Sequence, residues 1–275
     1  MTTTVACCQL ELQVGDPDGN RARVAGAVEQ AADRGAQVLV VPELANSGYV
    51  FRDAAEAASL AEPLDGPTVT AWAELADRLG VVLVGGFCER GPGVLHNSAV
   101  LVDPGGVRAV YRKAHLWDRE KLVFTPGEDA PPVVDTAFGR IGVVVCYDLE
   151  IPEWVRLPAI DGAELLCAPV NWPAFPRPAG ERPTEVVRVQ AMASVNRMFI
   201  AACARAGAER GVDWVSRSTI VDPDGWPLAL SSSDSADLLI ATCELAAARD
   251  KQISGHNDVH ADRRPALYAR LVERR

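Results

Sequence analysis

The stretch "GRIGVVVCYDLEIPEW", residues 139–154, contains the sharpest change of pattern in the chain. The apolar run at residues 141–145 predicts a buried β-strand that ends on Cys146. Asp148 and Pro152 do not belong inside a strand, and a proline is well tolerated in the first turn of a helix. The sequence therefore predicts a cysteine at a tight bend between a strand and a helix.

A cysteine at such a bend has two interpretations. Cysteine at the end of a valine run is most often inert core packing. A strand-to-helix bend, however, projects its side chain from the sheet edge, where nearby N–H groups face a developing anion. The helix N-terminus would also lower the pKa of the Cys146 thiol. On the second interpretation Cys146 is an exposed nucleophile, and Asp148 caps the helix or holds the bend.

Strand and helix patterns alternate on both sides of this bend, which predicts an α/β fold with helices on the outer faces of the sheets. The helices are expected at residues 20–36, 66–80, 152–163 and 184–197, the last with Thr184 as its N-cap. The strands are expected at residues 4–12, 37–44, 81–90, 139–146, 164–170, 198–205 and 236–245. Two hairpins, at residues 94–113 and 218–230, each enclose a Val-Asp-Pro turn.

No shift of composition marks a linker, so one domain over residues 1–275 is the simplest organisation. Residues 114–132 are expected to form a long ordered loop, and residues 171–183 a second loop. Residues 250–275 are charged and weakly periodic, which is typical of a tail that lies over another surface, such as that of a partner subunit.

Composition narrows the classes of function. The 275 residues are 48% hydrophobic and carry a net charge of −10, which argues against a nucleic-acid binder and suits small-molecule substrates. No signal peptide or membrane-spanning run is expected. Seven scattered cysteines without C-x-x-C spacing indicate a reducing cytoplasm and no zinc ribbon. No motif for a metal or an organic cofactor is present, so none is expected.

A thiol nucleophile needs a base, and three residues are candidates for the charged partners. Glu43 ends an apolar strand, although it would also suit a solvent-facing position at the start of a loop. Lys113 ends a hairpin arm, where lysine also serves to protect an edge strand. His115 is the best candidate among the four histidines.

Three blocks, "VVPELANSGYVF", "YRKAHLW" and "VVVCYDLEIPE", occur in this order at residues 40–51, 111–117 and 143–153. They resemble the Glu-Lys-Cys blocks of the nitrilase superfamily, the carbon-nitrogen hydrolases. The resemblance extends over nearly the whole chain through "HNSAVLVDPGG", "FTPGE", "APVNWP" and "DRRPALY". It implies a four-layer α-β-β-α sandwich, usually paired into a dimer, that works without a metal or organic cofactor.

The resemblance also implies roles for five residues. Glu43 would be the general base, Lys113 the oxyanion stabiliser and Cys146 the nucleophile. Glu120 would be a second acid that orients Lys113 or the substrate nitrogen, and Tyr147 would donate its backbone N–H to the oxyanion. Such a site hydrolyses a non-peptide C–N bond through a cysteine thioester and releases ammonia or an amine.

The substrate class follows less directly from the resemblance. Cys146-Tyr147-Asp148 looks like the amidase and carbamoylase branches, whereas true nitrilases commonly show Cys-Trp-Glu. Many amidase relatives carry an arginine where this chain has Glu150, so an arginine contact to a substrate carboxylate is not expected at that position. The expected lining of the pocket consists of Tyr49, Trp117, Asn171, Trp172 and Phe175. A nitrilase and a catalytically idle binding or regulatory homologue are the alternatives.

Overall fold

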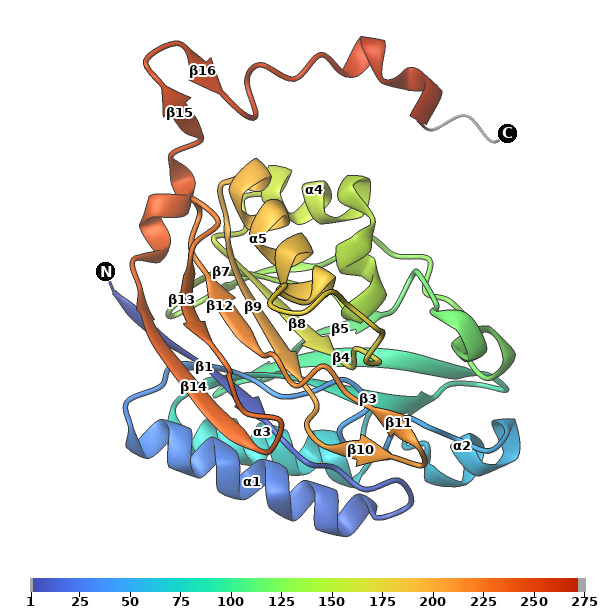
Figure 1. Cartoon of the computed structure of the whole chain (residues 1–275). Helices are drawn as coiled ribbons and strands as arrows, with labels where there is room; N and C mark the ends of the chain where they lie inside the picture. Colours follow the sequence, from blue (N-terminus) through green and yellow to red (C-terminus); the bar gives the residue numbers. More distant parts are fainter. Residues whose placement is uncertain (1, 272–275) are drawn as a thin grey trace.

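Figure 1 shows a computed structural model of the chain, which describes residues 2–271. Two mixed sheets lie face to face between two layers of helices. Helices α1 (Pro17–Asp33) and α3 (Pro67–Leu79) cover one outer face, and α4 (Pro152–Ile160) and α5 (Thr184–Asn196) cover the other. The expected four-layer α-β-β-α sandwich is confirmed.

The first sheet is built from the N-terminal half of the chain and one late strand. Its strands are β1 (Thr3–Gln9), β2 (Val38–Val40), β3 (Val82–Arg90), β4 (Leu95–Asp103), β5 (Gly106–Arg112) and β14 (Asp237–Cys243). The spatial order is β14-β1-β2-β3-β4-β5, with β1, β2 and β3 parallel and the outer pairs antiparallel.

The second sheet repeats this arrangement. Its strands are β6 (Val133–Thr136), β7 (Gly139–Val143), β8 (Leu165–Val170), β9 (Phe199–Ala204), β12 (Thr219–Val221) and β13 (Pro227–Leu230). The order is β13-β12-β9-β8-β7-β6, again with three central parallel strands, β7, β8 and β9. The hairpins β4–β5 and β12–β13 hold the two Val-Asp-Pro turns, so the expected recurrence of hairpins is confirmed.

The parallel strands are buried on both faces, which explains their nearly continuous apolar sequences. In β1, Cys7 points into the core between the sheets, whereas its neighbour Cys8 packs under α1 and α3. Side chains alternate between the two faces of a strand, so the adjacent cysteines serve two different cores. All seven cysteines are free and buried.

A buried polar side chain joins the two sheets. Gln9, at the end of β1, donates from Nε2 to the carbonyl oxygens of Ser233 (3.1 Å) and Ser235 (2.8 Å). Its Oε1 accepts from the backbone N–H (3.0 Å) and hydroxyl (2.9 Å) of Ser218, beside β12 in the second sheet. Because these groups are buried, each needs its partner, and Gln9 fixes the position of one sheet on the other.

The helices differ from the expectation in two places. Helix α2 (Ala54–Leu60) was not predicted, although Asp53 caps it by accepting from Glu56 N–H at 2.8 Å. Thr184 is the first helical residue and not the N-cap, because Pro183 occupies that position. Within residues 2–271, none of the helices is both long and apolar enough to cross a membrane.

The tail begins against the outer helical layer, where Lys251 Nζ donates to the carbonyl oxygens of Asn196 (3.2 Å) and Arg197 (2.8 Å) at the end of α5. It includes the short strands β15 (Gln252–Ser254) and β16 (Asn257–Asp258), followed by two 3₁₀ turns at Pro265–Leu267 and Ala269–Leu271. Figure 1 shows it extending past the α4 and α5 layer. Burial lowers the pKa of Arg156 in α4, and the charge of Arg263 in the tail lowers it further, so part of the tail lies near this helix of its own chain.

Candidate active site

The candidate residues lie just beyond the carboxyl ends of strands from both sheets. Glu43 follows β2, and Lys113 comes directly after β5 in the same sheet. Cys146 follows β7, and Asn171 comes directly after β8 in the other sheet. Glu120 lies in a 3₁₀ helix, Asp118–Leu122, inside the segment expected to be a long ordered loop.

A buried ion cluster forms the floor of the site. Lys113 Nζ lies 2.8 Å from Glu43 Oε1 and 2.8 Å from Glu120 Oε1. Asn97 Nδ2 also donates to Glu43 Oε1, at 2.7 Å. Glu43 Oε2 is buried and has no hydrogen-bond partner among residues 2–271. Glu43 is thus anchored through one oxygen, while the other stays available.

Glu120 is held more completely than Glu43. Its Oε1 accepts from Lys113 and from the Tyr49 hydroxyl, which lies 2.5 Å away. Its Oε2 accepts from the backbone N–H of Trp117 at 3.0 Å. Tyr49 was expected to line the pocket, but its hydroxyl is directed to Glu120. Glu120 therefore serves to hold Lys113 in place.

The backbone at Cys146 is strained. Strand β7 ends at Val143, and Cys146 begins a 3₁₀ helix, Cys146–Glu150, with φ of 48°. This left-handed conformation is unusual for a residue with a Cβ and persists only where the surroundings enforce it. The expected tight bend is present, although the strand stops earlier than expected.

Asp148 holds the bend through the hydrogen bonds of its carboxylate. Its Oδ2 accepts from the Val145 N–H (3.1 Å) and the Tyr111 hydroxyl (2.7 Å). His115 Nδ1 lies 2.8 Å from Asp148 Oδ1. Asp148 is thus structural, as expected, and His115, which is paired with it, is not among the residues that line the cavity at Cys146.

The thiol differs from the expectation in its ionisation. Burial raises the pKa of Cys146 well above its ordinary value, and the Glu43 carboxylate raises it further. The expectation that a helix N-terminus lowers this pKa is wrong, because only a short 3₁₀ helix begins here and the residue is just 5% exposed. Sγ contacts the Asn171 carbonyl oxygen at 3.5 Å. Burial therefore favours the neutral form of the Cys146 thiol.

The pKa values of Glu43 and Lys113 are both raised. Burial raises the pKa of Glu43 to about 7, against the opposing effect of Lys113. Burial by itself would lower the pKa of Lys113, but the carboxylates of Glu120 and Glu43 together raise it well above its ordinary value. Lys113 therefore stays charged, whereas Glu43 titrates near neutrality.

Two residues of the site were missed by sequence reasoning. Asn97, in the middle of a strand, holds Glu43. Arg205, fully buried just after β9, donates from Nη2 to the carbonyl oxygens of Glu43 (3.3 Å) and Leu44 (3.1 Å). Leu44 has φ of 47°, so the segment after Glu43 is strained like that at Cys146. An arginine at the end of an apolar strand was the available signal.

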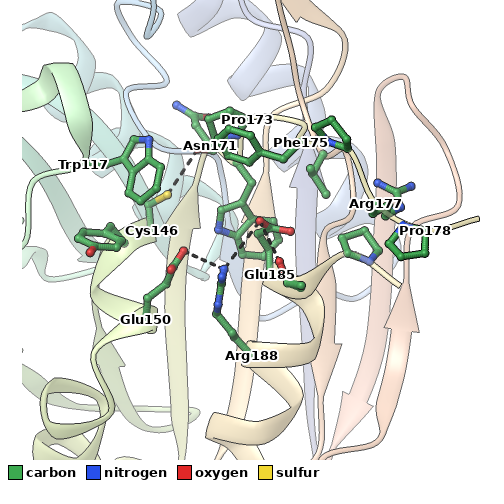
Figure 2. A pocket seen from close by; sticks show the side chains of 16 residues that line it. Trp117, Cys146, Glu150, Asn171, Pro173, Phe175, Arg177, Pro178, Glu185 and Arg188 are labelled. Carbon is green, nitrogen blue, oxygen red and sulfur yellow. Dashed lines mark hydrogen bonds and ion pairs between the residues drawn. The ribbon is translucent and has the colours of Figure 1, made fainter. Parts of the chain in front are cut away.

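A cavity of about 310 Å³ opens onto Cys146 (Figure 2). Its lining includes four of the expected residues, Trp117, Asn171, Trp172 and Phe175, as well as Tyr147. A neighbouring cavity of about 810 Å³ shares Trp117, Tyr147 and Phe175 and adds Tyr49 and Glu120. In the described part of the chain, no group of three or more histidine, cysteine or acidic side chains is arranged to hold a metal ion.

Asn171 connects the two sides of the site. Its side-chain Nδ2 donates to the backbone carbonyl oxygen of Glu43 at 3.1 Å. The backbone carbonyl oxygen of Asn171 accepts from the Cys146 thiol. Its Oδ1 is buried and unpaired among residues 2–271. Asn171 therefore links the end of β8, in the second sheet, to the Glu43 segment of the first sheet.

This fold and this site are those of a carbon-nitrogen hydrolase. The family model described as carbon-nitrogen hydrolase matches residues 4–252, and the chain belongs to this family. Among curated proteins, a nitrilase of Pyrococcus abyssi is 34% identical over 97% of this chain and 99% of its own. An (R)-stereoselective amidase of a Pseudomonas species is 35% identical over 79% of this chain and 76% of its own.

Among solved structures, the amidase of Nesterenkonia sp. AN1 is similar throughout. It matches at a TM-score of 0.80 and 27% identity, over 98% of this chain and 100% of that one, in a structure that shows Michael addition of acrylamide at the active-site cysteine. Another of its structures shows covalent addition of the acetamide moiety of fluoroacetamide at that cysteine. Within the superfamily this chain belongs to the amidase branch.

At Gly86, strand β3 passes very close to the Glu43 segment, so a substitution there tests how tightly the site is packed. A Cβ built there would lie 2.5 Å from Glu43 Cα and 2.8 Å from Leu44 N, so β3 reaches the Glu43 segment only without a side chain. Gly86→Ala should lower the free energy of unfolding by about 2 kcal/mol. It should also lower kcat/KM, because Glu43 is displaced. Denaturant unfolding and ammonia release measure the two effects.

The matched control is Gly26→Ala, in α1, where an added Cβ meets nothing within 4 Å. This variant should keep full activity and gain slightly in stability, since alanine is the better helix former. Equal losses in both variants would contradict the assigned role of Gly86.

Proposed function

We propose that this protein hydrolyses the C–N bond of a small linear amide or N-carbamoyl compound through a thioester on Cys146. The observation that carries the proposal is the buried Lys113 cluster, which Asn171 links to Cys146, the residue that a cavity opens onto. A base, a cation and a sulfur in such an arrangement meet the needs of acyl transfer.

In the first step Glu43 acts as the general base. Oε2, the unpaired oxygen, accepts the thiol proton while Sγ attacks the carbonyl carbon, which makes the carbonyl oxygen an oxyanion. An ammonium has three N–H donors, and Lys113 uses two on carboxylates, so the third is available to the oxyanion. The backbone N–H of Tyr147 is the second donor.

The intermediate then collapses. The C–N bond breaks as Glu43 returns its proton to the leaving nitrogen, and ammonia or an amine departs from the thioester. Water attacks the thioester while Glu43 takes a proton from it, and the carboxylic acid leaves as the proton returns to sulfur. Glu120 acts as a positioning residue, since its oxygens are engaged with Lys113, Tyr49 and Trp117.

A nitrilase is the second candidate, favoured by the name of the Pyrococcus abyssi relative. Both activities would use the same cysteine and release ammonia from the substrate. Only the preferred substrate, an amide or a nitrile, distinguishes them. The tyrosine and aspartate that follow Cys146 favour the amide. Faster acid formation from nitriles than from the matching amides would reverse this preference.

The proposal is tested by ammonia release from a panel of amides, ω-amides, carbamoyl amines and nitriles. Cys146→Ala should abolish turnover, and Glu43→Gln should lower kcat by about a hundredfold or more through loss of the general base. Cys8→Ala, a buried cysteine packed under the helices, is the matched control and should retain activity. If wild type does not exceed Cys146→Ala on any of these compounds, the proposed function is wrong.

The pKa of Glu43 predicts a pH dependence. Glu43 must be deprotonated to accept the thiol proton, so kcat/KM should decrease as the pH falls below about 7. The decrease should approach about tenfold per pH unit. Initial rates between pH 5 and 9, with circular dichroism to verify folding, measure the profile. A rate that stays constant down to pH 5 would exclude Glu43 as the base.

We also propose a homodimer. Apolar side chains are exposed on two neighbouring helices, Leu157 and Ile160 on α4 and Val187 and Val195 on α5, and the tail extends past this layer (Figure 1). A second copy would cover such a surface. Sedimentation of the full chain should give twice the mass of 29.4 kDa, and a monomer at micromolar concentration would contradict the proposal.

A cytoplasmic location is proposed as well. All seven cysteines are buried and free, and most pack as small apolar side chains, which suits a reducing compartment. A disulfide in protein isolated from its native cells would contradict this location.

A further inference from the structure

The cavity that opens onto Cys146 carries a second charged cluster, outside the catalytic groups. Glu150 ends the 3₁₀ helix that Cys146 begins, so both side chains reach the cavity from one short segment. Glu185 and Arg188 come from α5 and line the same cavity (Figure 2). No step proposed for the hydrolysis uses these three residues.

The cluster has more negative than positive charge. Arg188 Nη1 lies 3.0 Å from Glu150 Oε1 and 3.7 Å from Glu185 Oε1, so both carboxylates depend on the same nitrogen of one guanidinium. Within residues 2–271, no hydrogen bond reaches the Glu150 carboxylate, and its ion pair with Arg188 is made through Oε1. Two carboxylates and one guanidinium leave one net negative charge on this wall of the cavity.

Glu150 shares its 3₁₀ helix with Cys146. Partial burial raises its pKa and Arg188 only partly opposes the shift, as expected for a carboxylate with too few partners. Arg177, the other arginine in the cavity lining, lies on the far side of Glu185 and Arg188 from Glu150 in Figure 2. Lys113 is already shared between two carboxylates. Glu150 thus has room for another cation.

From this geometry we infer that Glu150 is a specificity-determining residue that selects amides bearing a positively charged amine a few carbons from the scissile carbonyl. The inference rests on the proposed amidase function. The ammonium would donate to Glu150 Oε2, forming a charge-assisted hydrogen bond. The rings of Trp117 and Tyr147, which line the same cavity, also favour a cation. A carboxylate at that position would instead meet the excess negative charge.

Matched substrates test the inference in the wild-type protein. The panel consists of ω-amino amides with two to four methylenes, each paired with two analogues that carry a methyl or a carboxylate in place of the ammonium. At pH 7.5 the amines are protonated. For the best chain length, kcat/KM should be about tenfold or more above that of the methyl analogue. The carboxylate analogue should be the poorest substrate.

Glu150→Gln keeps the size of the side chain and removes its charge. The ratio of kcat/KM between the amino amide and its methyl analogue should fall about tenfold, mostly through KM. Glu74→Gln, on the exposed face of α3 and away from the cavity, is the matched control and should leave the ratio unchanged. The ratio is internal to each variant, so a general loss of activity does not imitate the effect.

The outcomes separate this inference from the proposed function. A preference for the carboxylate analogue, or a ratio that is the same in Glu150→Gln and wild type, would overturn the role of Glu150 while hydrolysis of the amides still supports the amidase. Since the wild-type panel decides the sign of the preference, the test holds even if Glu150→Gln does not fold. Absence of turnover on every amide would overturn both.

Discussion

The site depends on one interaction, the sharing of the Lys113 ammonium between two buried carboxylates. Burying three charges is expensive, and each is tolerated only because the others are present and well placed. Glu120 accepts three hydrogen bonds and so fixes the ammonium, which in turn fixes one oxygen of Glu43. The other oxygen of Glu43 is buried and has no hydrogen-bond partner in the described part of the chain, and burial raises the affinity of this carboxylate for a proton.

The backbone around the cluster is also held by buried polar side chains. Leu44 and Cys146 both adopt left-handed conformations, one beside the carboxylate and the other at the sulfur itself. Buried polar side chains hold each of them: Arg205 binds the carbonyl oxygens at Glu43 and Leu44, and Asp148 binds the N–H that precedes Cys146. The strain is therefore maintained by hydrogen bonds that reach the site from other parts of the chain.

Much of this arrangement is predictable from the sequence, because apolar runs, turns and the three charged blocks are local signals. The two hairpins and the bend at Cys146 follow from them, whereas the four layers are implied by the resemblance to the nitrilase superfamily. What the sequence did not indicate depends on contacts between distant residues. Asn97 and Arg205 look like ordinary strand residues until the fold brings them to Glu43. The thiol pKa was misjudged because burial, which outweighs the helix terminus here, is a property of the whole sandwich.

The hydrogen bonds that Gln9 makes between the two sheets limit how these sheets can move relative to each other. Glu43 and Lys113 follow strands of one sheet, and Cys146 follows a strand of the other, so these side chains meet across the plane between the sheets. Sliding of one layer on the other by a fraction of a side chain would separate them without unfolding anything. By joining β1 to the serine beside β12, Gln9 opposes that sliding, and a side chain of no chemical reactivity thereby keeps the two halves of the site in alignment.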